Sequence, residues 1–180
     1  MQDVAVQVRM TAPALYHYFD SKQRLLFEVI ERSLERYHAD LEVALGAVAG
    51  SPTAELAAFV RTHLAFQLDR VEGARIYNAM FLGTGALLAA LSPGQRAKIM
   101  RLQSEIRGRL KAALERGRAS GEFAFADVMV TAMGILAMGE FAVSWFRPEG
   151  RLTAAEVADQ YAGLAVRMVA AGPHDDSTRG

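Results

Sequence analysis

The chain has 180 residues, 52% of them hydrophobic and none of them cysteine; this fits one sizeable domain or a small module fused to a larger one, and it excludes a disulfide scaffold or a thiolate metal site. A formal net charge of zero excludes a protein that coats nucleic acid non-specifically, so any DNA binding must come from a small local surface. The first residues contain no apolar run of signal-peptide length, so we expect no export and a cytoplasmic location.

Two short helices joined by a tight turn are predicted before Lys22. The apolar side chains expected to face inward from them are Val4, Ala5, Val8, Leu15 and Phe19. The segment Arg9-Met10-Thr11 forms the turn, and Thr11 can cap the second helix. Two short helices with this connection are the geometry that lays a recognition helix in the major groove of DNA.

The second of these helices carries the candidate DNA-reading residues. The side chains expected on or near its exposed face are Thr11, Ala12, Ala14, Tyr16, His17 and Tyr18. They suit contacts to thymine methyl groups and hydrogen bonds to phosphate more than bidentate recognition of guanine. Lys22 is expected in the first turn of the next helix, where its ammonium and the helix-end amides can both bind phosphate. The alternative is that Tyr16 and Tyr18 only pack the small domain.

A long amphipathic helix of about seven turns is predicted to begin at Ser21. Its apolar residues recur at steps of three and four: Leu25, Leu26, Val29, Ile30, Leu34, Tyr37, Leu41 and Leu45. Gly46 and Gly50 lie near its end, where glycine commonly stops helices. Ser51-Pro52 then begins a helix expected to bury Leu56, Phe59, Val60, His63, Leu64, Gln67 and Val71.

The middle of the chain is also predicted to be helical. A helix starts at Gly73 and is interrupted or bent by Gly83 and Gly85, and Ser92-Pro93 opens a long one that ends near Ser120. The apolar stripe of that long helix is Ile99, Leu102, Ile106, Leu110 and Leu114. The longest uncharged stretch, residues 76–95, is broken before it reaches the roughly 20 apolar residues of a membrane span. We therefore expect a buried helix there and no membrane partner.

The last two helices are predicted over 127–146 and 153–170. The first is apolar nearly all round, which predicts burial on every side, in a core or in a subunit interface; its one interior charge, Glu140, is either a buried acid or part of an interface ion pair. Thr153 and Glu156 form a capping box for the second. One face of that helix carries Val157, Tyr161, Leu164, Ala165 and Met168. No segment indicates a sheet, so the predicted fold class is all-α.

The first 26 residues resemble the signature of the TetR family of transcriptional regulators. The matching elements are Val4-Ala5, Met10-Thr11, Leu15-Tyr16, Phe19, Ser21-Lys22 and Leu25-Leu26. The resemblance implies an N-terminal helix-turn-helix followed by a helical-bundle domain for ligand binding and dimerisation. It implies base or phosphate contacts from Thr11, Ala14, Tyr16, His17 and Tyr18, and a phosphate contact from Lys22.

The resemblance also implies a domain organisation and a partner. Residues 1–40 form the helix-turn-helix and connecting helix, 41–172 form the effector-binding and dimerisation domain, and 173–180 are a disordered tail. In the family the last two long helices pair with their symmetry mates, so a homodimer is expected through 127–146 and 153–170. Gly134 and Gly139 would permit close approach there. Two recognition helices one DNA turn apart would then read a palindromic operator.

Two departures from the family pattern concern DNA binding. Arg9 occupies a turn position where the family usually has glycine, which strains the turn or shifts the helix angle. The family's helix-turn-helix also follows an earlier helix, and here Met1 falls at the start of the second one. Either the start codon is assigned too far downstream, or the chain is a shortened form that has lost DNA binding and acts as a dimeric ligand-binding protein.

The segment from Ser144 to Thr153 and on to Tyr161 is similar to TetR-type regulators of fatty-acid and sterol catabolism, some of which respond to acyl-CoA thioesters. Polar residues on otherwise apolar helices are the groups that orient a ligand in a cavity. The candidate ligand-binding residues are His63, Gln67, Arg75, Asn78, Phe81 and Met133. The alternatives are that His63 and Gln67 are core residues bonded to backbone and that the methionines only fill the core.

An enzyme is the competing class of function. None of the four histidines has metal-binding spacing, and neither a GxSxG motif nor a phosphate loop is present, so we expect no enzymatic activity, no metal and no cofactor. The prediction is a repressor that binds a palindromic DNA operator as a dimer. A small hydrophobic effector, with acyl-CoA as one candidate, would release it.

Overall fold

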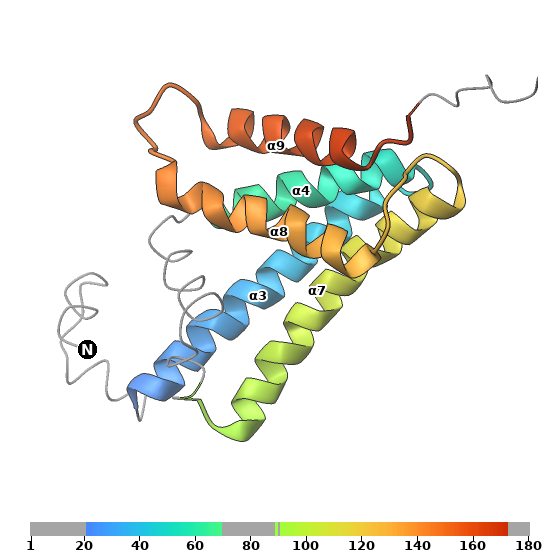
Figure 1. The fold of residues 1–180 in the computed structure, drawn as a ribbon. Helices are drawn as coiled ribbons and strands as arrows, with labels where there is room; N and C mark the ends of the chain where they lie inside the picture. Colours follow the sequence, from blue (N-terminus) through green and yellow to red (C-terminus); the bar gives the residue numbers. More distant parts are fainter. Residues whose placement is uncertain (1–20, 70–88, 90, 173–180) are drawn as a thin grey trace, which may run out of the picture.

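A computed structural model describes residues 21–69, 89 and 91–172 (Figure 1), and these residues form five helices and no β-strand. The helices are α3 (Lys22–Gly46), α4 (Pro52–Asp69), α7 (Pro93–Ala119), α8 (Val128–Trp145) and α9 (Ala154–Val169). The all-α fold class is therefore confirmed.

Side-chain caps set the helix starts where the sequence predicts them. Ser21 Oγ accepts from the Arg24 amide at 3.1 Å, so α3 begins one residue later. Ser92 and Gln95 form a reciprocal capping box at the start of α7. Thr153 and Glu156 form the predicted box at the start of α9. These local signals make the boundaries readable without any tertiary contact.

Helix α4 is the centre of the bundle, because it contacts each of the other four helices. Figure 1 shows α3 and α7 running side by side, with α4, α8 and α9 stacked across their upper halves. Fully buried side chains from all five helices form one core, among them Leu34, Leu41, Leu56, Phe59, Leu64, Ile99, Leu110, Ile135 and Ala162. The α7 stripe predicted from the sequence faces this core, and only Leu102 of that stripe is half-buried.

Phe123, in the loop between α7 and α8, contacts the C-terminal ends of both α7 and α9. Phe123 forms a single antiparallel bridge with Ala170, and the Phe123 ring lies over Gly117 so closely that a Cβ there would overlap it. Gly121 ends α7 with a φ of +80°, a conformation that glycine adopts without a steric penalty.

Helices α8 and α9 each bury one face within the chain and expose another. Helix α8 is not buried on every side within the chain: Ala132, Ile135 and Ala142 are buried, while Met129 and Phe141 belong to an exposed face. On α9, the face that packs is rotated from the predicted stripe. It buries Val157, Ala158, Ala162, Ala165 and Val169, whereas Leu164 and Met168 are exposed. Small alanines pack closely against α4, so the larger side chains of α9 lie outside the core.

Candidate functional site

The predicted DNA-reading residues precede the described part of the chain. Thr11, Ala14, Tyr16, His17 and Tyr18 all lie outside it, and their roles stay predictions. Lys22 does lie in the first turn of α3, as the sequence predicts, directly after the capping residue Ser21. Its phosphate contact is likewise still a prediction.

A buried polar cluster lies where α3, α4 and α8 meet. Tyr37 of α3 and His63 of α4 are 3% and 5% exposed, and the tyrosine hydroxyl is 3.0 Å from His63 Nδ1. Gln67, one turn further along α4, is completely buried. The Tyr37 ring stacks on Phe66 with ring centroids 4.5 Å apart. The cluster therefore combines a phenol, an imidazole and a carboxamide inside an aromatic and aliphatic core.

His63 is neutral in the folded protein. Burial lowers its pKa to about 4 from the usual 6.5, and a backbone interaction with Leu136 of α8 opposes part of that shift. Nε2 makes no hydrogen bond of good geometry within the described residues, although Nδ1 is paired with Tyr37. Nδ1 is therefore paired with Tyr37, and the ring also interacts with the Leu136 backbone.

Gly139 lets α8 approach the imidazole closely. A Cβ at this position would lie 2.5 Å from His63 Cδ2 and 2.8 Å from Nε2, closer than real Cβ contacts. The sequence predicts Gly139 to serve close approach between subunits. In the structure, the close approach that it permits is within the chain, between α8 and α4.

Gln67 is the residue of the cluster whose two polar side-chain atoms are both buried without a partner among the described residues. Neither its Oε1 nor its Nε2 has a hydrogen-bond partner in the described part of the chain, although both atoms are buried. Each such group costs about 1–3 kcal/mol if it stays unpaired. Since buried polar groups in proteins are nearly always paired, the Gln67 amide is a candidate for contact with a bound molecule.

The remaining predicted ligand residues do not add to this cluster. Arg75, Asn78 and Phe81 lie outside the described residues. Met133 is 48% exposed and belongs to the outer face of α8, so the structure does not bring it together with His63 and Gln67. Tyr37, which the sequence places only on an apolar stripe, is the cluster member that the prediction missed.

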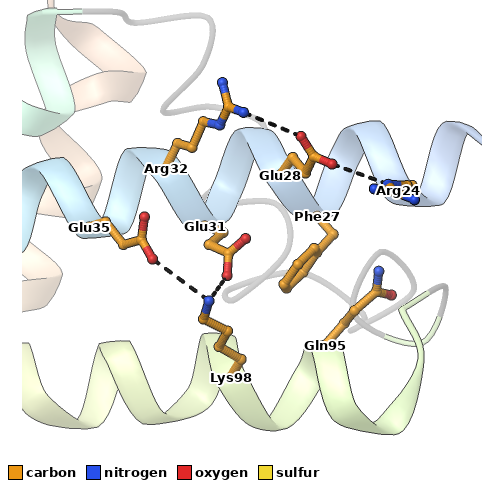
Figure 2. A pocket seen from close by; sticks show the side chains of 8 residues that line it. All are labelled: Arg24, Phe27, Glu28, Glu31, Arg32, Glu35, Gln95 and Lys98. Atoms are coloured by element: carbon orange, nitrogen blue, oxygen red, sulfur yellow. Dashed lines mark hydrogen bonds and ion pairs between the residues drawn. The ribbon is translucent and has the colours of Figure 1, made fainter. Parts of the chain in front are cut away.

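A charged recess of about 530 Å³ lies between the first halves of α3 and α7 (Figure 2). Its lining is Arg24, Phe27, Glu28, Glu31, Arg32, Glu35, Gln95 and Lys98. Three acids face three bases, so the recess carries no net charge. Lys98 of α7 pairs with Glu31 and, at 3.7 Å, with Glu35 of α3. The Glu31 hydrogen bond raises the pKa of Lys98, which stays charged. None of the predicted ligand residues lines this recess.

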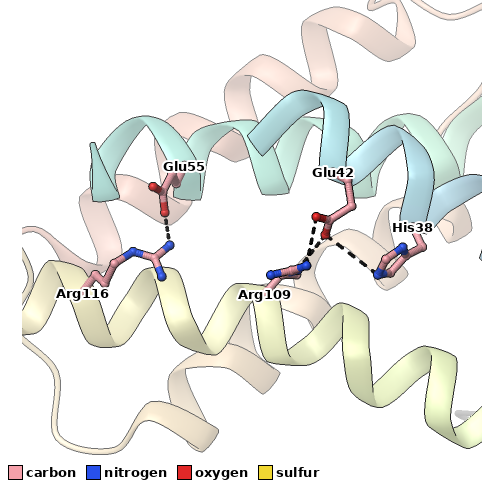
Figure 3. A network of polar contacts seen from close by, with 5 residues as sticks. All are labelled: His38, Glu42, Glu55, Arg109 and Arg116. Atoms are coloured by element: carbon pink, nitrogen blue, oxygen red, sulfur yellow. Dashed lines mark hydrogen bonds and ion pairs between the residues drawn. The ribbon is translucent and has the colours of Figure 1, made fainter. Parts of the chain in front are cut away.

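Further ion pairs connect α7 to α3 and α4 (Figure 3). Arg109 contacts both carboxylate oxygens of Glu42, at 2.6 and 2.9 Å. Arg116 pairs with the buried Glu55, which also accepts from the Gly50 amide at 3.1 Å. Together with Lys98, these arginines form a row of cations along α7 that faces acids of α3 and α4. The sequence does not predict these pairs, because their partners lie far apart along the chain.

An apolar surface, here called the outer face, covers α8 and α9. Its exposed large side chains are Met129, Val130, Met133, Phe141, Trp145, Leu164 and Met168. Gly134 lies among them on α8, and a Cβ there would meet nothing within 4 Å.

By length and composition, α8 is the one described helix that could span a membrane; core helices of water-soluble proteins pass the same test. Within the described ranges, no cluster of His, Asp or Glu could hold a metal ion.

Comparisons with known proteins cover both parts of the chain. The family model for "Bacterial regulatory proteins, tetR family" matches residues 1–29. The model for "Tetracyclin repressor-like, C-terminal domain" matches residues 49–169. The first match overlaps α3 over residues 22–29, and the second contains His63, Gln67 and the outer face.

Individual relatives agree with these matches. The HTH-type transcriptional regulator BetI of Agrobacterium fabrum is 39% identical over 70 residues, which are 39% of this chain and 32% of BetI. The TetR-family regulator PfmR of Thermus thermophilus is 32% identical, with a TM-score of 0.74 over 92% of this chain and 86% of PfmR. The regulator AibR, solved with isovaleryl coenzyme A and operator DNA, is 25% identical, with a TM-score of 0.71 over 91% of this chain and 84% of AibR.

Proposed function

Because the chain belongs to the TetR family of bacterial transcriptional regulators, we propose that it is a cytoplasmic repressor that binds a palindromic operator as a dimer and is released by a small hydrophobic effector. The family, PfmR and BetI are transcriptional regulators and not enzymes. The observation that carries the effector part of the proposal is the buried, unpaired amide of Gln67 beside His63.

The outer face of α8 and α9 is the proposed dimer interface. Its apolar side chains lie on adjacent helices, and a two-fold axis would place this face against the same face of a second chain. Trp145 and Tyr161 stack with centroids 6.4 Å apart and would form one edge of the contact. Burial of apolar surface contributes about 25 cal/mol per Å², so covering this face stabilises the dimer.

The effector site is proposed around His63 and Gln67, with Arg75, Asn78 and Phe81 as further contacts. AibR was solved with isovaleryl coenzyme A, a short-chain acyl-CoA. An acyl-CoA is therefore one candidate for this chain: its acyl chain would lie in the apolar core, and its thioester carbonyl could accept a hydrogen bond from the Gln67 amide.

The effector site is connected to α3 by direct contact. Tyr37 hydrogen-bonds to His63 and belongs to the helix whose first turn carries Lys22. The Lys98 pairs with Glu31 and Glu35 connect the same helix to α7. An effector that moves α4 against α3 would therefore reorient the DNA-reading segment. A tenfold loss of operator affinity requires only about 1.4 kcal/mol of difference in effector affinity between the two states.

Selection from a random duplex DNA library tests the DNA-binding half of the proposal. We expect the purified chain to enrich a palindrome and to bind it as a dimer in analytical ultracentrifugation. Lys22→Ala should weaken binding to all duplexes alike and lower the slope of log affinity against log salt by about one. No enrichment of any sequence would contradict operator binding and favour a dimeric ligand-binding protein instead.

A further inference from the structure

Lys98 lies at the border between the core and the charged recess (Figure 2). On α7 it directly precedes Ile99, the first buried residue of that helix. Its partner Glu31 directly follows Ile30, the first buried apolar residue of α3. From these residues toward the starts of both helices, the mostly polar lining of the recess takes the place of apolar packing. The Lys98–Glu31 pair is therefore a contact between α3 and α7 at the edge of the core.

Two carboxylates of α3 hold the Lys98 ammonium. The Glu31 side chain is 14% exposed and that of Lys98 is 41% exposed, so the pair is partly shielded from water. Glu35, one turn further along α3, lies 3.7 Å from the same ammonium. Salt screens partly buried pairs less than fully exposed ones, so this contact persists at ionic strengths that weaken exposed pairs.

A second ion pair joins the two helices three turns further on. Arg109 contacts Glu42 at 2.6 and 2.9 Å (Figure 3), and the two residues are 67 positions apart, as are Lys98 and its first partner on α3. The helices therefore run in the same direction with one register. Each residue of the second pair adjoins a fully buried leucine in sequence, Leu41 or Leu110. Core packing supports the helices at Arg109, whereas Lys98 lies at the edge of that packing.

We propose that Lys98 is a positioning residue: its pairs with Glu31 and Glu35 set the angle of the first half of α3 on α7, and with it the placement of the DNA-reading segment that precedes α3. The consequence for DNA rests on the proposed function, but the position of α3 does not. Loss of the pairs lets the first two turns of α3 move across the recess while the far half stays packed. Lys98 acts through α3 and does not itself contact DNA.

Spin labels measure the position of α3 directly. The chain has no cysteine, so Gln23→Cys on α3 and Ser104→Cys on α7, both at exposed positions, would carry the only two labels. Double electron–electron resonance gives the distance distribution between them, and excess unlabelled chain keeps labelled chains apart in any dimer. A tilt of roughly 15° over two turns, about 11 Å of helix, displaces the start of α3 by about 3 Å.

Charge reversal separates the two ion pairs. Lys98→Glu places a carboxylate against two acids of α3, so we expect the mean label distance to shift, or its distribution to widen, by about 3 Å or more. The double variant Glu31→Lys with Lys98→Glu restores the pair with opposite polarity and should restore the parent distribution. Arg109→Glu is the matched control and should leave the distribution unchanged. No change in Lys98→Glu overturns the inference, and an equal change in Arg109→Glu overturns the assignment to Lys98.

Operator affinity tests the consequence for DNA. On the duplex recovered by selection, we expect Lys98→Glu to bind about tenfold more weakly and the double variant to bind within about threefold of the parent chain. A direct phosphate contact from Lys98 would not be restored in this way, because a carboxylate at position 98 repels DNA. A double variant that restores the label distances but not the affinity therefore overturns the positioning role. Recovery of no duplex overturns the proposed function, and the label distances still decide how α3 is held.

Discussion

The hydroxyl of Tyr37 lies 3.0 Å from Nδ1 of His63, and both residues are buried. This hydrogen bond joins α3, the helix that follows the DNA-reading segment in sequence, to α4, the helix that carries the unpaired Gln67. Water cannot replace a bond in the core, so a displacement of α4 relative to α3 leaves both groups unpaired. The bond is a direct polar connection between the proposed effector site and α3.

Removing the Tyr37 hydroxyl tests this connection. Tyr37→Phe keeps the ring that stacks on Phe66 but leaves His63 Nδ1 unpaired, so we expect a loss of about 1–2 kcal/mol in the free energy of unfolding. Urea denaturation would measure it. Tyr161→Phe, on the half-buried Tyr161 of α9, is the control and should change stability by less than about 0.5 kcal/mol. Equal losses in the two variants would mean that the buried hydrogen bond contributes nothing of its own.

The neutrality of His63 predicts a pH dependence of stability. The folded protein holds its pKa near 4 while the unfolded chain has 6.5, so between these values the unfolded state binds a proton that the folded state excludes. Stability is therefore full above pH 6.5 and falls as the pH drops toward 4, by about 3 kcal/mol at 1.36 kcal/mol per pKa unit.

Comparison with His63→Gln isolates this contribution. The raised pKa of Glu140 acts in the opposite direction, because a folded carboxyl that binds its proton more tightly gains stability as the pH falls. The difference between the two proteins cancels Glu140 and the other acids. We expect the variant's unfolding free energy to be less sensitive to pH between 6.5 and 4 than that of the parent chain. Parallel curves would show that His63 titrates normally in the fold.

Gly139 should tolerate no side chain while His63 is present. Gly139→Ala places a methyl 2.5 Å from the imidazole, so we expect a loss of about 1–3 kcal/mol in unfolding free energy. Gly108→Ala, at an exposed glycine inside α7 with nothing within 4 Å, should gain roughly 0.5–1 kcal/mol from helix propensity. In a His63→Ala background the Gly139 substitution should cost much less. An unchanged cost in the double variant would place the clash elsewhere.

The helix boundaries could be predicted because caps are local. Ser21, Ser92 and Thr153 each precede their helix with a side chain that binds a free backbone amide, and the sequence predicts two of these starts from short motifs, Ser92-Pro93 and Thr153 with Glu156. The face of α9 that packs against the core could not be predicted in this way. Leu164 and Met168 form the more hydrophobic stripe, yet Ala162 and Ala165 face the core. Periodicity shows that a face is apolar but not whether the chain itself or a partner covers it.

The candidate site was predicted in part for a related reason. His63 and Gln67 are polar residues on an apolar helix face, a pattern that predicts ligand contacts or buried core residues, and both are buried in the structure. Tyr37 was placed on an apolar stripe, although a buried tyrosine hydroxyl commonly seeks a partner. Its partner lies 26 residues away, and the α7 cations lie still further from their acids along the chain. Such pairings depend on tertiary structure and leave no local pattern.

The outer face predicts a dimer that one substitution can disrupt. Gly134→Met has open space within the chain, so the monomer should fold, but the added side chain would separate two α8 helices that pack across a two-fold axis. We expect the dimer dissociation constant to rise about tenfold or more, measured by sedimentation equilibrium. Gly108→Met makes the same exchange at an exposed position of α7 and should leave association unchanged. Equal association of both variants would remove Gly134 from the interface.

The most direct test of the effector-controlled repressor measures DNA affinity and effector response together. The duplex recovered by selection would be labelled and titrated with the chain in fluorescence anisotropy, with and without saturating isovaleryl coenzyme A, the acyl-CoA bound by AibR. We predict that the acyl-CoA weakens the binding about tenfold or more, equivalent to about 1.4 kcal/mol of coupling, and that Gln67→Met, which removes the buried amide, binds the duplex normally but loses this response. An acyl-CoA that binds the parent chain and leaves its DNA affinity unchanged would contradict an effector-controlled repressor.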